Sequence, residues 1–320
     1  MKCIEVSAPS HVHVGNIDIH GGLGRLYGTL GFALRRPRFR ARVCPSDEVE
    51  VVGSKRSDLL DAARRASRLG GIPIRVEVAE EIPPHVGLGS TTPAYTGIAH
   101  AATILAGKEA DPRGIAYAMG RARVSGLGLY SYIYGGFLVD GGYRSPSPEG
   151  PPPLIFRRGI PGDLVVVYAV PSKPLPGILE LKAREEEILG SLPPMPEEQA
   201  LRNSRLVVMG IMPAAAEGDW ESLGVFLTRF NRGLGEYWAR EQGGEYCCSE
   251  VEEIVKYMLG AGGLCACQSS WGPTVYALTP RDKVSRLLEG LKELVNSMGG
   301  GLVGSSRVDN YGAVLRVAKG

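Results

Sequence analysis

The strongest constraint on the fold is a run of small and apolar residues, TPAYTGIAHAATILAG, which starts at Thr92 and extends past Ala106. Its apolar positions recur at helical spacing, and side chains this small suit a helix that is buried on most sides. A glycine-bearing segment, PPHVGLGST, precedes this run directly and follows a strand-like run, IRVEVAE. A buried helix that starts from a glycine loop after a strand predicts a core built from helices and sheet together.

Length, composition and charge describe an ordinary globular chain. The 320 residues are 44% apolar and 22% charged, which excludes a disordered tail, a fibre and a small disulfide-stapled module. A formal net charge of +2 provides no general basic field, so we expect no nucleic-acid partner. No segment approaches the roughly 18 uninterrupted apolar residues of a membrane span, and the N-terminus lacks the apolar core of a signal peptide. We therefore expect a cytoplasmic protein without a membrane partner.

The cysteines and amides bear on the cellular setting. No C-x-x-C spacing occurs, so a tetrahedral zinc site is not expected. Buried thiols in a reducing compartment are the simpler expectation, but a disulfide between the pair Cys247 and Cys248 and the pair Cys265 and Cys267 stays open. Five Asn, three Gln and 27 Arg against 9 Lys favour a thermophilic source.

A proline-rich segment divides the chain. RSPSPEGPPP, residues 144–153, cannot form a regular element, so we place a domain boundary there, with one domain at 1–155 and a second at 156–320. Helices are predicted over 57–69, 92–106, 112–123, 179–189, 199–217, 220–238, 249–260 and 281–298. Strands are predicted for KCIEVSA, FRARVCP, VEVVG, IRVEVAE, YIYGGFLVDGG, DLVVVYAVP, CACQSS, TVYALTP and residues 313–317. Strands that alternate with helices in two halves predict an α+β architecture with two layers in each half.

The glycine loop before the small-residue helix is suited to binding an anion. The first turn of a helix exposes up to four unpaired N–H groups and about half a positive charge. Gly87 and Gly89 let the backbone approach a phosphate closely, while Ser90, Thr91 and Thr92 add hydroxyl donors. The loop is neither a Walker A motif nor G-x-G-x-x-G, so a plain N-cap remains an alternative.

Two further polar, glycine-bearing loops strengthen the prediction of a phosphorylated ligand. Ser125-Gly126-Leu127-Gly128 follows a predicted helix end that carries Arg121 and Arg123, and QSSWGPT, residues 268–274, interrupts a predicted hairpin. Each loop alone is compatible with a tight turn. Three such loops together favour a shared phosphate-binding cleft.

The N-terminal strand carries an unusual set of polar residues. His11 and His13 share one face, as do Asn16 and Asp18, so the two pairs converge if a turn lies near Gly15. A metal site is chemically feasible there, although hydrogen-bonded core histidines are the more frequent case. In the third loop, Trp271 either stacks on an aromatic ligand or anchors the turn as a buried side chain.

These motifs resemble the GHMP kinase superfamily and, within it, the archaeal β-ribofuranosylaminobenzene 5′-phosphate synthases. The similar segments are SHVHVGNIDIHGGLGRLYGTLGFAL, EIPPHVGLGSTTPA, GRARVSGLGLYSYIYGGFLVDGG, QSSWGPTVYAL and SSRVDNYGAVL, which together span nearly the whole chain. The resemblance implies a ribosomal-protein-like β-α-β N-terminal domain, a ferredoxin-like C-terminal domain and an active site between them. A homodimer is compatible with it. It also implies that phosphoribosyl diphosphate joins 4-aminobenzoate or 4-hydroxybenzoate with loss of diphosphate and CO₂, for methanopterin-type cofactor synthesis.

The implied chemistry assigns roles to the loops, with Mg²⁺ accompanying the diphosphate. The predicted phosphate-binding residues are Gly87, Gly89, Ser90, Thr91, Thr92, Arg25, Arg121, Arg123, Gly126 and Gly128. The predicted substrate-binding residues are His13, Ser269, Trp271, Gly272, Thr274 and Asn310. The predicted catalytic residues are Asp18, Ser125 and Ser270, with Asp18 also the predicted magnesium ligand.

Some positions depart from the family pattern, which leaves alternatives open. His11, the segment Thr91 to Pro93, and Val124 differ from the usual residues. The kinase motif P-S-G-x-D lacks its aspartate here, because Gly128 follows Ser125-Gly126-Leu127. An ATP-dependent small-molecule kinase and a phosphate-ligand sensor without catalysis are the alternatives to the synthase.

Overall fold

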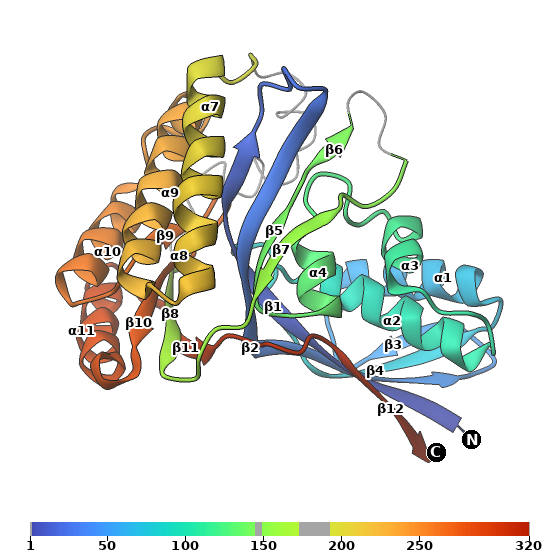
Figure 1. The fold of residues 1–320 in the computed structure, drawn as a ribbon. Helices are drawn as coiled ribbons and strands as arrows, with labels where there is room; N and C mark the ends of the chain where they lie inside the picture. Colours follow the sequence, from blue (N-terminus) through green and yellow to red (C-terminus); the bar gives the residue numbers. More distant parts are fainter. Residues whose placement is uncertain (1, 145–148, 173–192, 320) are drawn as a thin grey trace.

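The computed structural model describes residues 2–144, 149–172 and 193–319, which form two β-sheets flanked by helices (Figure 1). The larger sheet has the order β12-β1-β2-β4-β3, with β5 and β6 paired to β2, and β7 paired to β5. Its strands are β1 (Lys2–Asp18), β2 (Arg25–Pro45), β3 (Glu50–Val52), β4 (Ile74–Glu80), β5 (Phe137–Asp140), β6 (Tyr143–Arg144), β7 (Leu154–Arg158) and β12 (Val314–Lys319). The smaller sheet, in the order β11-β8-β10-β9, consists of β8 (Leu164–Pro171), β9 (Cys267–Gln268), β10 (Val275–Pro280) and β11 (Gly301–Arg307).

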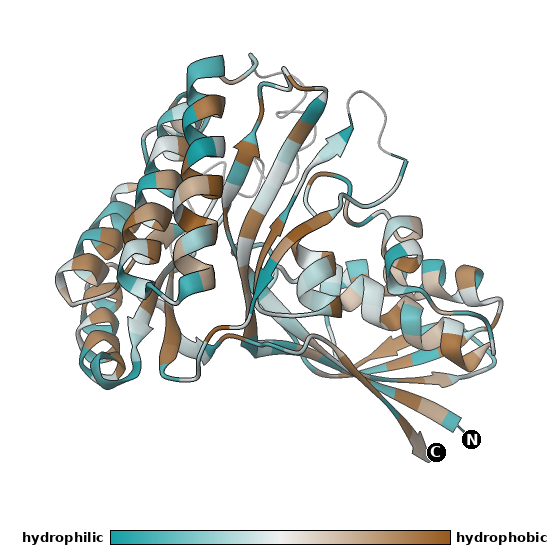
Figure 2. Ribbon diagram, in the orientation of Figure 1, coloured by the Kyte–Doolittle hydropathy of each residue, from teal (hydrophilic) through white to brown (hydrophobic). Residues whose placement is uncertain are grey.

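The helices fall into two groups along the chain, and α7, α8 and α9 of the second group also contact strands β1 or β7 of the larger sheet. The first half contains α1 (Ser57–Gly70), α2 (Thr91–Leu105), α3 (Pro112–Ala118) and α4 (Leu127–Ile133). The second half contains α7 (Glu197–Leu206), a π-helical segment η1 (Val207–Ile211), α8 (Met212–Glu217), α9 (Trp220–Gln242), α10 (Ser249–Gly260), a 3₁₀ turn η2 (Arg281–Lys283) and α11 (Val284–Ser297). The helices of the second half carry alternating hydrophilic and hydrophobic stripes in Figure 2, as expected for helices that cover one face of a sheet.

The small-residue helix forms where the sequence predicts it. Helix α2 packs on β1 and β2 and is buried along most of its length, including Ala94, Ile98 and Ala101. At Gly97 an added Cβ would lie 2.7 Å from a side-chain carbon of Val6 on β1, so only a residue without a side chain allows this close approach. The small side chains therefore set the distance between helix and sheet.

Several sequence predictions in the first half are wrong in extent; the strand predicted for FRARVCP, for example, is only the end of β2. The predicted helix from Pro112 to Arg123 ends at Ala118, where α3 stops. The predicted strand YIYGGFLVDGG begins only at Phe137, because residues 127–133 form α4 and a glycine pair follows it. The predicted helix over 179–189 lies outside the described residues.

A β-bulge replaces the turn predicted near Gly15. Strand β1 continues to Asp18, and its pairing with β2 shifts register between His13 and Gly15. A Cβ at Gly15 would lie 2.8 Å from atoms of Leu234 and Phe230 on α9, so the glycine serves close helix packing rather than chain reversal. Because the bulge changes the alternation of side chains, His11, His13, Asn16 and Asp18 come to share one face.

The predicted boundary near residue 155 falls inside β7, which pairs with β5 of the larger sheet. The C-terminal strand β12 also returns to the larger sheet, where it pairs with β1 from Lys2 to Ser7. The division into 1–155 and 156–320 stays a prediction.

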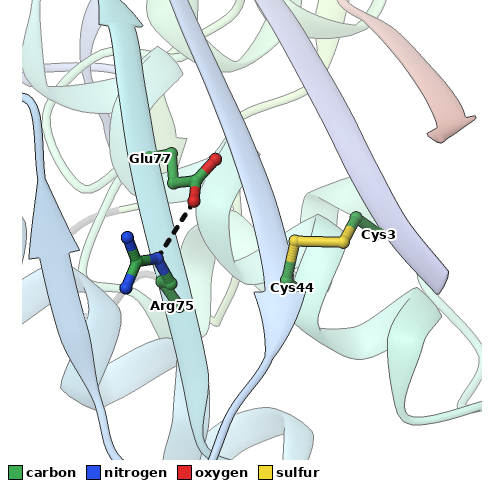
Figure 3. Close-up of a disulfide and its surroundings, with 4 residues drawn as sticks. All are labelled: Cys3, Cys44, Arg75 and Glu77. Atoms are coloured by element: carbon green, nitrogen blue, oxygen red, sulfur yellow. Dashed lines mark hydrogen bonds and ion pairs between the residues drawn. A yellow bond between two sulfur atoms is a disulfide. The ribbon is translucent and has the colours of Figure 1, made fainter. Parts of the chain in front are cut away.

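A disulfide joins the first two strands. Cys3 on β1 and Cys44 on β2 are bonded across the sheet, next to the Arg75–Glu77 ion pair of β4 (Figure 3). The sequence analysis did not anticipate this pairing. The other four cysteines are free thiols, so the disulfide left open between residues 247/248 and 265/267 is not formed.

No helix among the described residues has both the length and the apolar character needed to cross a membrane.

Candidate active site

The candidate site is built along an open edge of β1. Strand β12 covers this edge only as far as Ser7, and the following residues of β1 bond to loops instead. The His11 N–H donates to the Leu88 carbonyl at 3.2 Å, and the His13 N–H donates to Ser269 Oγ at 3.0 Å. One strand edge thus holds the glycine loop of the first half and the QSSWGPT loop of the second half together.

The glycine loop enters α2 in the predicted manner. Helix α2 begins at Thr91, and its N-cap Ser90 makes no side-chain capping bond. Gly87 and Gly89 both have positive φ, at 97° and 65°. A Cβ at Gly87 would lie 2.9 Å from the Ser269 carbonyl oxygen, and one at Gly89 would lie 2.1 Å from His11 Cε1. Glycine is therefore required at both positions by backbone conformation and by space.

The QSSWGPT loop braces the glycine loop. Ser269 Oγ donates to the Gly87 carbonyl at 2.6 Å, and Thr274 Oγ1 donates to the Val86 carbonyl at 2.6 Å. Both side chains are fully buried. The hydroxyl protons predicted to bind substrate are thus already engaged, so Ser269 and Thr274 hold the glycine loop in shape rather than offering donors to a ligand.

The other residues of the QSSWGPT loop differ in exposure: Trp271 and Gly272 are packed in the interior, whereas Ser270 is exposed. Trp271 is 5% exposed, and its ring lies 4.6 Å from that of Trp238 on α9. A Cβ at Gly272 would lie 2.9 Å from Cys247 Sγ, so this residue is also part of the packing. Ser270 is exposed, with a positive φ of 54°. Among the predicted residues of this loop, Ser270 presents its side chain most openly to solvent.

Two neutral histidines lie beside the glycine loop. Burial lowers the pKa of His11 to about 3, with further contributions from the neighbouring His13 and Arg121 charges, and burial lowers the pKa of His13 to about 4. The Nδ1 atoms of both rings are buried and have no hydrogen-bond partner within the part of the chain that the structure describes. Arg121, near enough to His11 to affect its pKa, brings a positive charge to the side of the site where an anion would bind.

The SGLG loop meets the glycine loop through the first turns of two helices. A Cβ at Gly128 on α4 would lie 2.9 Å from Thr92 Oγ1 on α2 and 3.0 Å from His11 Cε1. Ser125 precedes α4, and its Oγ lies 2.8 Å from Thr29 Oγ1 on β2. The structure therefore brings Ser125 and Gly128 together with the glycine loop, although their roles stay predictions.

A carboxylate that the sequence analysis missed lies behind Ser125. Asp140, 1% exposed, accepts hydrogen bonds from the N–H groups of Gly126 and Gly142 and from Thr29 Oγ1. Burial raises its pKa. The signal in the sequence was a charged residue that ends the apolar run FLVD and precedes two glycines.

A pocket opens where β1 faces α9. Its enclosed space is about 30 Å³, and about 470 Å³ when the open space at its mouth is included; Trp238, Trp271 and His13 are among its walls. The chain has eight amide side chains, and four of them line this pocket: Asn16, Asn231, Gln242 and Gln268. Aromatic walls with a few amides are typical of small-molecule sites, but an enclosed space of about 30 Å³ admits an aromatic ring only if these walls move apart.

Three of these amides form a network that the sequence analysis missed. Asn231 Nδ2 donates to the carbonyls of Val14 and Gln268, at 2.7 and 2.9 Å. Gln268 in turn donates to Gln242 Oε1 at 3.2 Å and accepts from the Cys247 N–H at 2.8 Å. The network ties α9 to β1 and β9, which fixes the pocket wall. Scarcity of Asn and Gln in the chain was the signal that could have identified it.

Two of the predicted arginines point elsewhere. Arg25 donates to the carbonyls of Gly141 and Gly142, at 2.8 and 2.7 Å. Arg123 lies over the Tyr117 ring, 5.2 Å from its centroid. The structure does not place either guanidinium against the glycine loop, because each is engaged by its own surroundings.

Asn310 is also remote from the glycine loop. Its side chain accepts from the Ile160 N–H at 3.0 Å and donates to the Ile160 carbonyl at 2.9 Å, near Gly135 at the C-terminal end of α4. Its amide thus fixes the returning C-terminal segment and is not free for the predicted substrate contact.

Asp18 lies farther along β1, five residues beyond His13, or about 16 Å at ordinary strand rise. Its Oδ1 accepts from the N–H groups of His20 and Gly21, at 2.7 and 2.9 Å, which closes the turn after the strand. Within the described ranges no group of three or more His, Cys, Asp or Glu could hold a metal ion. Mg²⁺ is usually held by one or two carboxylates together with substrate phosphates, so Asp18 as a magnesium ligand stays a prediction.

Comparison with known proteins places this geometry in a family. Homoserine kinase from Cytophaga hutchinsonii has a similar fold, with a TM-score of 0.70 at 20% identity over 98% of this chain and 97% of that one. Residues 211–297 match the family model of the C-terminal domain of GHMP kinases. These findings confirm the predicted GHMP-kinase-like two-domain fold.

Two archaeal relatives are more similar in sequence. The β-ribofuranosylphenol 5′-phosphate synthase of Archaeoglobus fulgidus is 31% identical over 290 residues, which cover 86% of this chain and 88% of the relative. That of Methanothermobacter thermautotrophicus is 30% identical over 298 residues, with the same coverage. The chain belongs to the β-ribofuranosylphenol 5′-phosphate synthase family. Membership of this synthase family confirms the resemblance on which the sequence analysis relied.

Proposed function

We propose that this enzyme joins phosphoribosyl diphosphate to a 4-substituted benzoate, releasing diphosphate and CO₂ to form an aryl ribofuranoside 5′-phosphate. The observation that carries the proposal is the arrangement along β1, where the glycine loop at the N-terminus of α2 and an aromatic, amide-lined pocket lie side by side. The names of the archaeal relatives specify a phenol, which favours 4-hydroxybenzoate over 4-aminobenzoate as the acceptor. The product would then enter the synthesis of a methanopterin-type cofactor.

The proposed reaction exchanges one bond to the sugar for another. The ring carbon that bears the carboxylate attacks the anomeric carbon, and the bond from that carbon to the diphosphate oxygen breaks. Loss of CO₂ then returns its bonding electron pair to the ring, which becomes aromatic again. The barrier falls when the site stabilises the departing diphosphate and holds the ring above the sugar.

The chain supplies groups for both demands. At the N-terminus of α2, the N–H groups of the glycine loop would stabilise the growing charge on the diphosphate, with Arg121 as the nearby cation. In the pocket, Trp271 and Trp238 provide apolar walls for the ring, and His13 and Asn16 provide polar groups on β1. The neutral state of His13 would let it accept a hydrogen bond from a phenol hydroxyl.

A kinase would need an accessible carboxylate near Ser125, but the carboxylate that lies there, Asp140, is buried. Asp140 is buried and engaged by two backbone N–H groups and Thr29, so it cannot reach the hydroxyl of a substrate. The position of this carboxylate favours the synthase chemistry over phosphoryl transfer.

The test incubates the protein with phosphoribosyl diphosphate, Mg²⁺ and carboxyl-labelled 4-hydroxybenzoate or 4-aminobenzoate, and follows labelled CO₂ and free diphosphate. We expect equal amounts of both products, with at least a tenfold loss of kcat/KM in His13→Ala. Thr228→Ala on α9, outside the pocket, is the control variant. Absence of CO₂ release with both acceptors would overturn the proposal. ADP formation from ATP and an alcohol would then support a kinase, and ligand binding without turnover would support a sensor.

A further inference from the structure

Asp140 is a buried carboxylate without a cationic partner among the described residues. It ends β5 and is 1% exposed, and the Gly142 N–H donates to its Oδ1 at 2.9 Å while the Gly126 N–H donates to its Oδ2 at 2.9 Å. Thr29 Oγ1 donates to the same Oδ2. Burying a charge in this way is costly unless hydrogen bonds compensate for the lost water. Such an arrangement calls for a role other than an ion pair.

Counting protons fixes the direction of the hydrogen bonds that lead from Asp140 to Ser125. An ionised carboxylate only accepts, so the single hydroxyl proton of Thr29 is directed at Asp140. Ser125 Oγ lies 2.8 Å from Thr29 Oγ1, and Ser125 must therefore donate in that pair. The Leu127 N–H donates to Ser125 Oγ at 3.2 Å. With Asp140 ionised, Ser125 can only accept a hydrogen bond from a ligand.

Protonation of Asp140 reverses this chain. The carboxylic acid donates to Thr29, Thr29 donates to Ser125, and the hydroxyl proton of Ser125 becomes free for a ligand. A phosphoryl oxygen is an acceptor, so it requires the reversed chain. We propose that Asp140, acting through Thr29, sets whether Ser125 accepts or donates a hydrogen bond at the site, so that binding of a phosphoryl anion is coupled to proton uptake at Asp140.

The inference rests on the proposed function, because it needs a phosphorylated ligand at Ser125. The placement of Ser125 supports this requirement. It lies directly before α4, whose Gly128 packs against Thr92 and His11 at the start of α2. A diphosphate held at the N-terminus of α2 would therefore lie next to the Ser125 hydroxyl. Asp140 does not touch the ligand and is a positioning residue.

Of the titratable groups around Asp140, we expect Asp140 itself to be the one that changes protonation when an anion binds. Tyr130 on α4 and Tyr143 on β6 face it, and burial raises the pKa of both phenols, so they stay neutral. Arg25 donates to the carbonyls that follow Asp140, at Gly141 and Gly142, and Arg123 and Arg113 act on the two tyrosines. Burial raises the pKa of Asp140 itself, which moves its protonation toward the range where enzymes work.

Calorimetric titration with inorganic diphosphate tests the coupling. Titrations at pH 6 in two buffers of different ionisation enthalpy give the number of protons taken up on binding. Because diphosphate itself titrates, the informative quantity is the difference between the wild-type protein and Thr29→Val, which removes the hydroxyl but keeps the shape. We expect the wild-type protein to take up more protons than this variant, by up to one per site. Thr29→Ser restores the hydroxyl and should restore the extra uptake.

Asp140→Asn provides an independent variant because it cannot take up a proton; an amide nitrogen directed at Thr29 would also leave the Gly126 N–H without the acceptor that Oδ2 provides. The affinity of this variant for diphosphate should vary less with pH than that of the wild-type protein. In the wild-type protein, protonation of Asp140 changes the affinity by as much as about tenfold per pH unit. Equal proton uptake in the wild-type protein and Thr29→Val would overturn the coupling while leaving the synthase proposal intact. Failure of the wild-type protein to bind diphosphate would overturn the coupling, and continued CO₂ release in that case would show that the synthase proposal survives without it.

Discussion

Acidification should destabilise the protein through the two histidines of β1. Burial lowers the pKa of His11 to about 3 and that of His13 to about 4, whereas both have a pKa of about 6.5 in the unfolded chain. As the pH falls through 6.5, the unfolded chain binds two protons that the folded protein does not. The stability that neutral histidines provide is thus complete above pH 6.5 and is lost progressively down to about pH 3.

The size of the effect follows from these pKa values. Between pH 7 and pH 5, each histidine lowers the free energy of unfolding by about 2 kcal/mol, so His11 and His13 together account for about 4 kcal/mol. That is a large part of the roughly 5–15 kcal/mol by which folded proteins exceed their unfolded states. Most carboxylates stay ionised in this window, so the histidines should dominate the change.

Urea unfolding at pH 7 and pH 5 measures this loss. Between pH 7 and pH 5, the variant His11→Asn/His13→Asn should lose only the part of the unfolding free energy that other groups contribute. One of these groups is His100, whose pKa is also lowered by burial. Val12→Ala is the matched control, because Val12 lies buried between the two histidines and does not titrate. It should lower stability equally at both pH values. A double variant that loses as much stability as the wild-type protein between pH 7 and pH 5 would refute the reasoning.

Two further predictions concern the glycine loop and the disulfide. Gly89→Ala should weaken diphosphate binding at least tenfold, because the new Cβ would lie 2.1 Å from His11 Cε1. Gly107 is also at positive φ but has open space around it, so the affinity of the control variant Gly107→Ala should stay within twofold of the wild-type value. Similar affinities for the two variants in calorimetry would contradict this prediction. Replacing Cys3 and Cys44 by alanine should lower the free energy of unfolding by about 3–4 kcal/mol, as expected for a cross-link that spans 41 residues. Dithiothreitol should cause the same loss in the wild-type protein, and unchanged urea midpoints would contradict the prediction.

Local patterns in the sequence predicted most of the helices and the position of the glycine loop. Helix α10 has the predicted bounds, Ser249–Gly260, and α2 differs from its prediction by one residue at each end. Both depend on hydrophobic periodicity and on nearby end signals. The glycine loop could be predicted because close backbone approach and helix N-termini leave a local trace in residue type.

The errors arose where distant residues decide the outcome. Gly15 looked like a turn residue, but contact with α9, more than 200 residues away, determines its use. Ser269 and Thr274 looked like ligand donors, yet their protons are bonded to carbonyls of the glycine loop. Asp140 was missed because two of its partners, Thr29 and Gly126, come from other segments of the chain. Such contacts have no period or spacing that a single sequence can display.

The pairing of the first strand with the last has a consequence for synthesis on the ribosome. Residues 2–7 of β1 are made long before their partner β12, which emerges only when residues 314–319 have been translated. Until then the nascent chain carries an unpaired strand edge with Ile4 and Val6, side chains that are buried in the finished protein. Exposed edges of this kind pair readily with other chains. A truncated chain that ends near residue 155 should therefore aggregate rather than fold, because it lacks the strand that pairs with this edge.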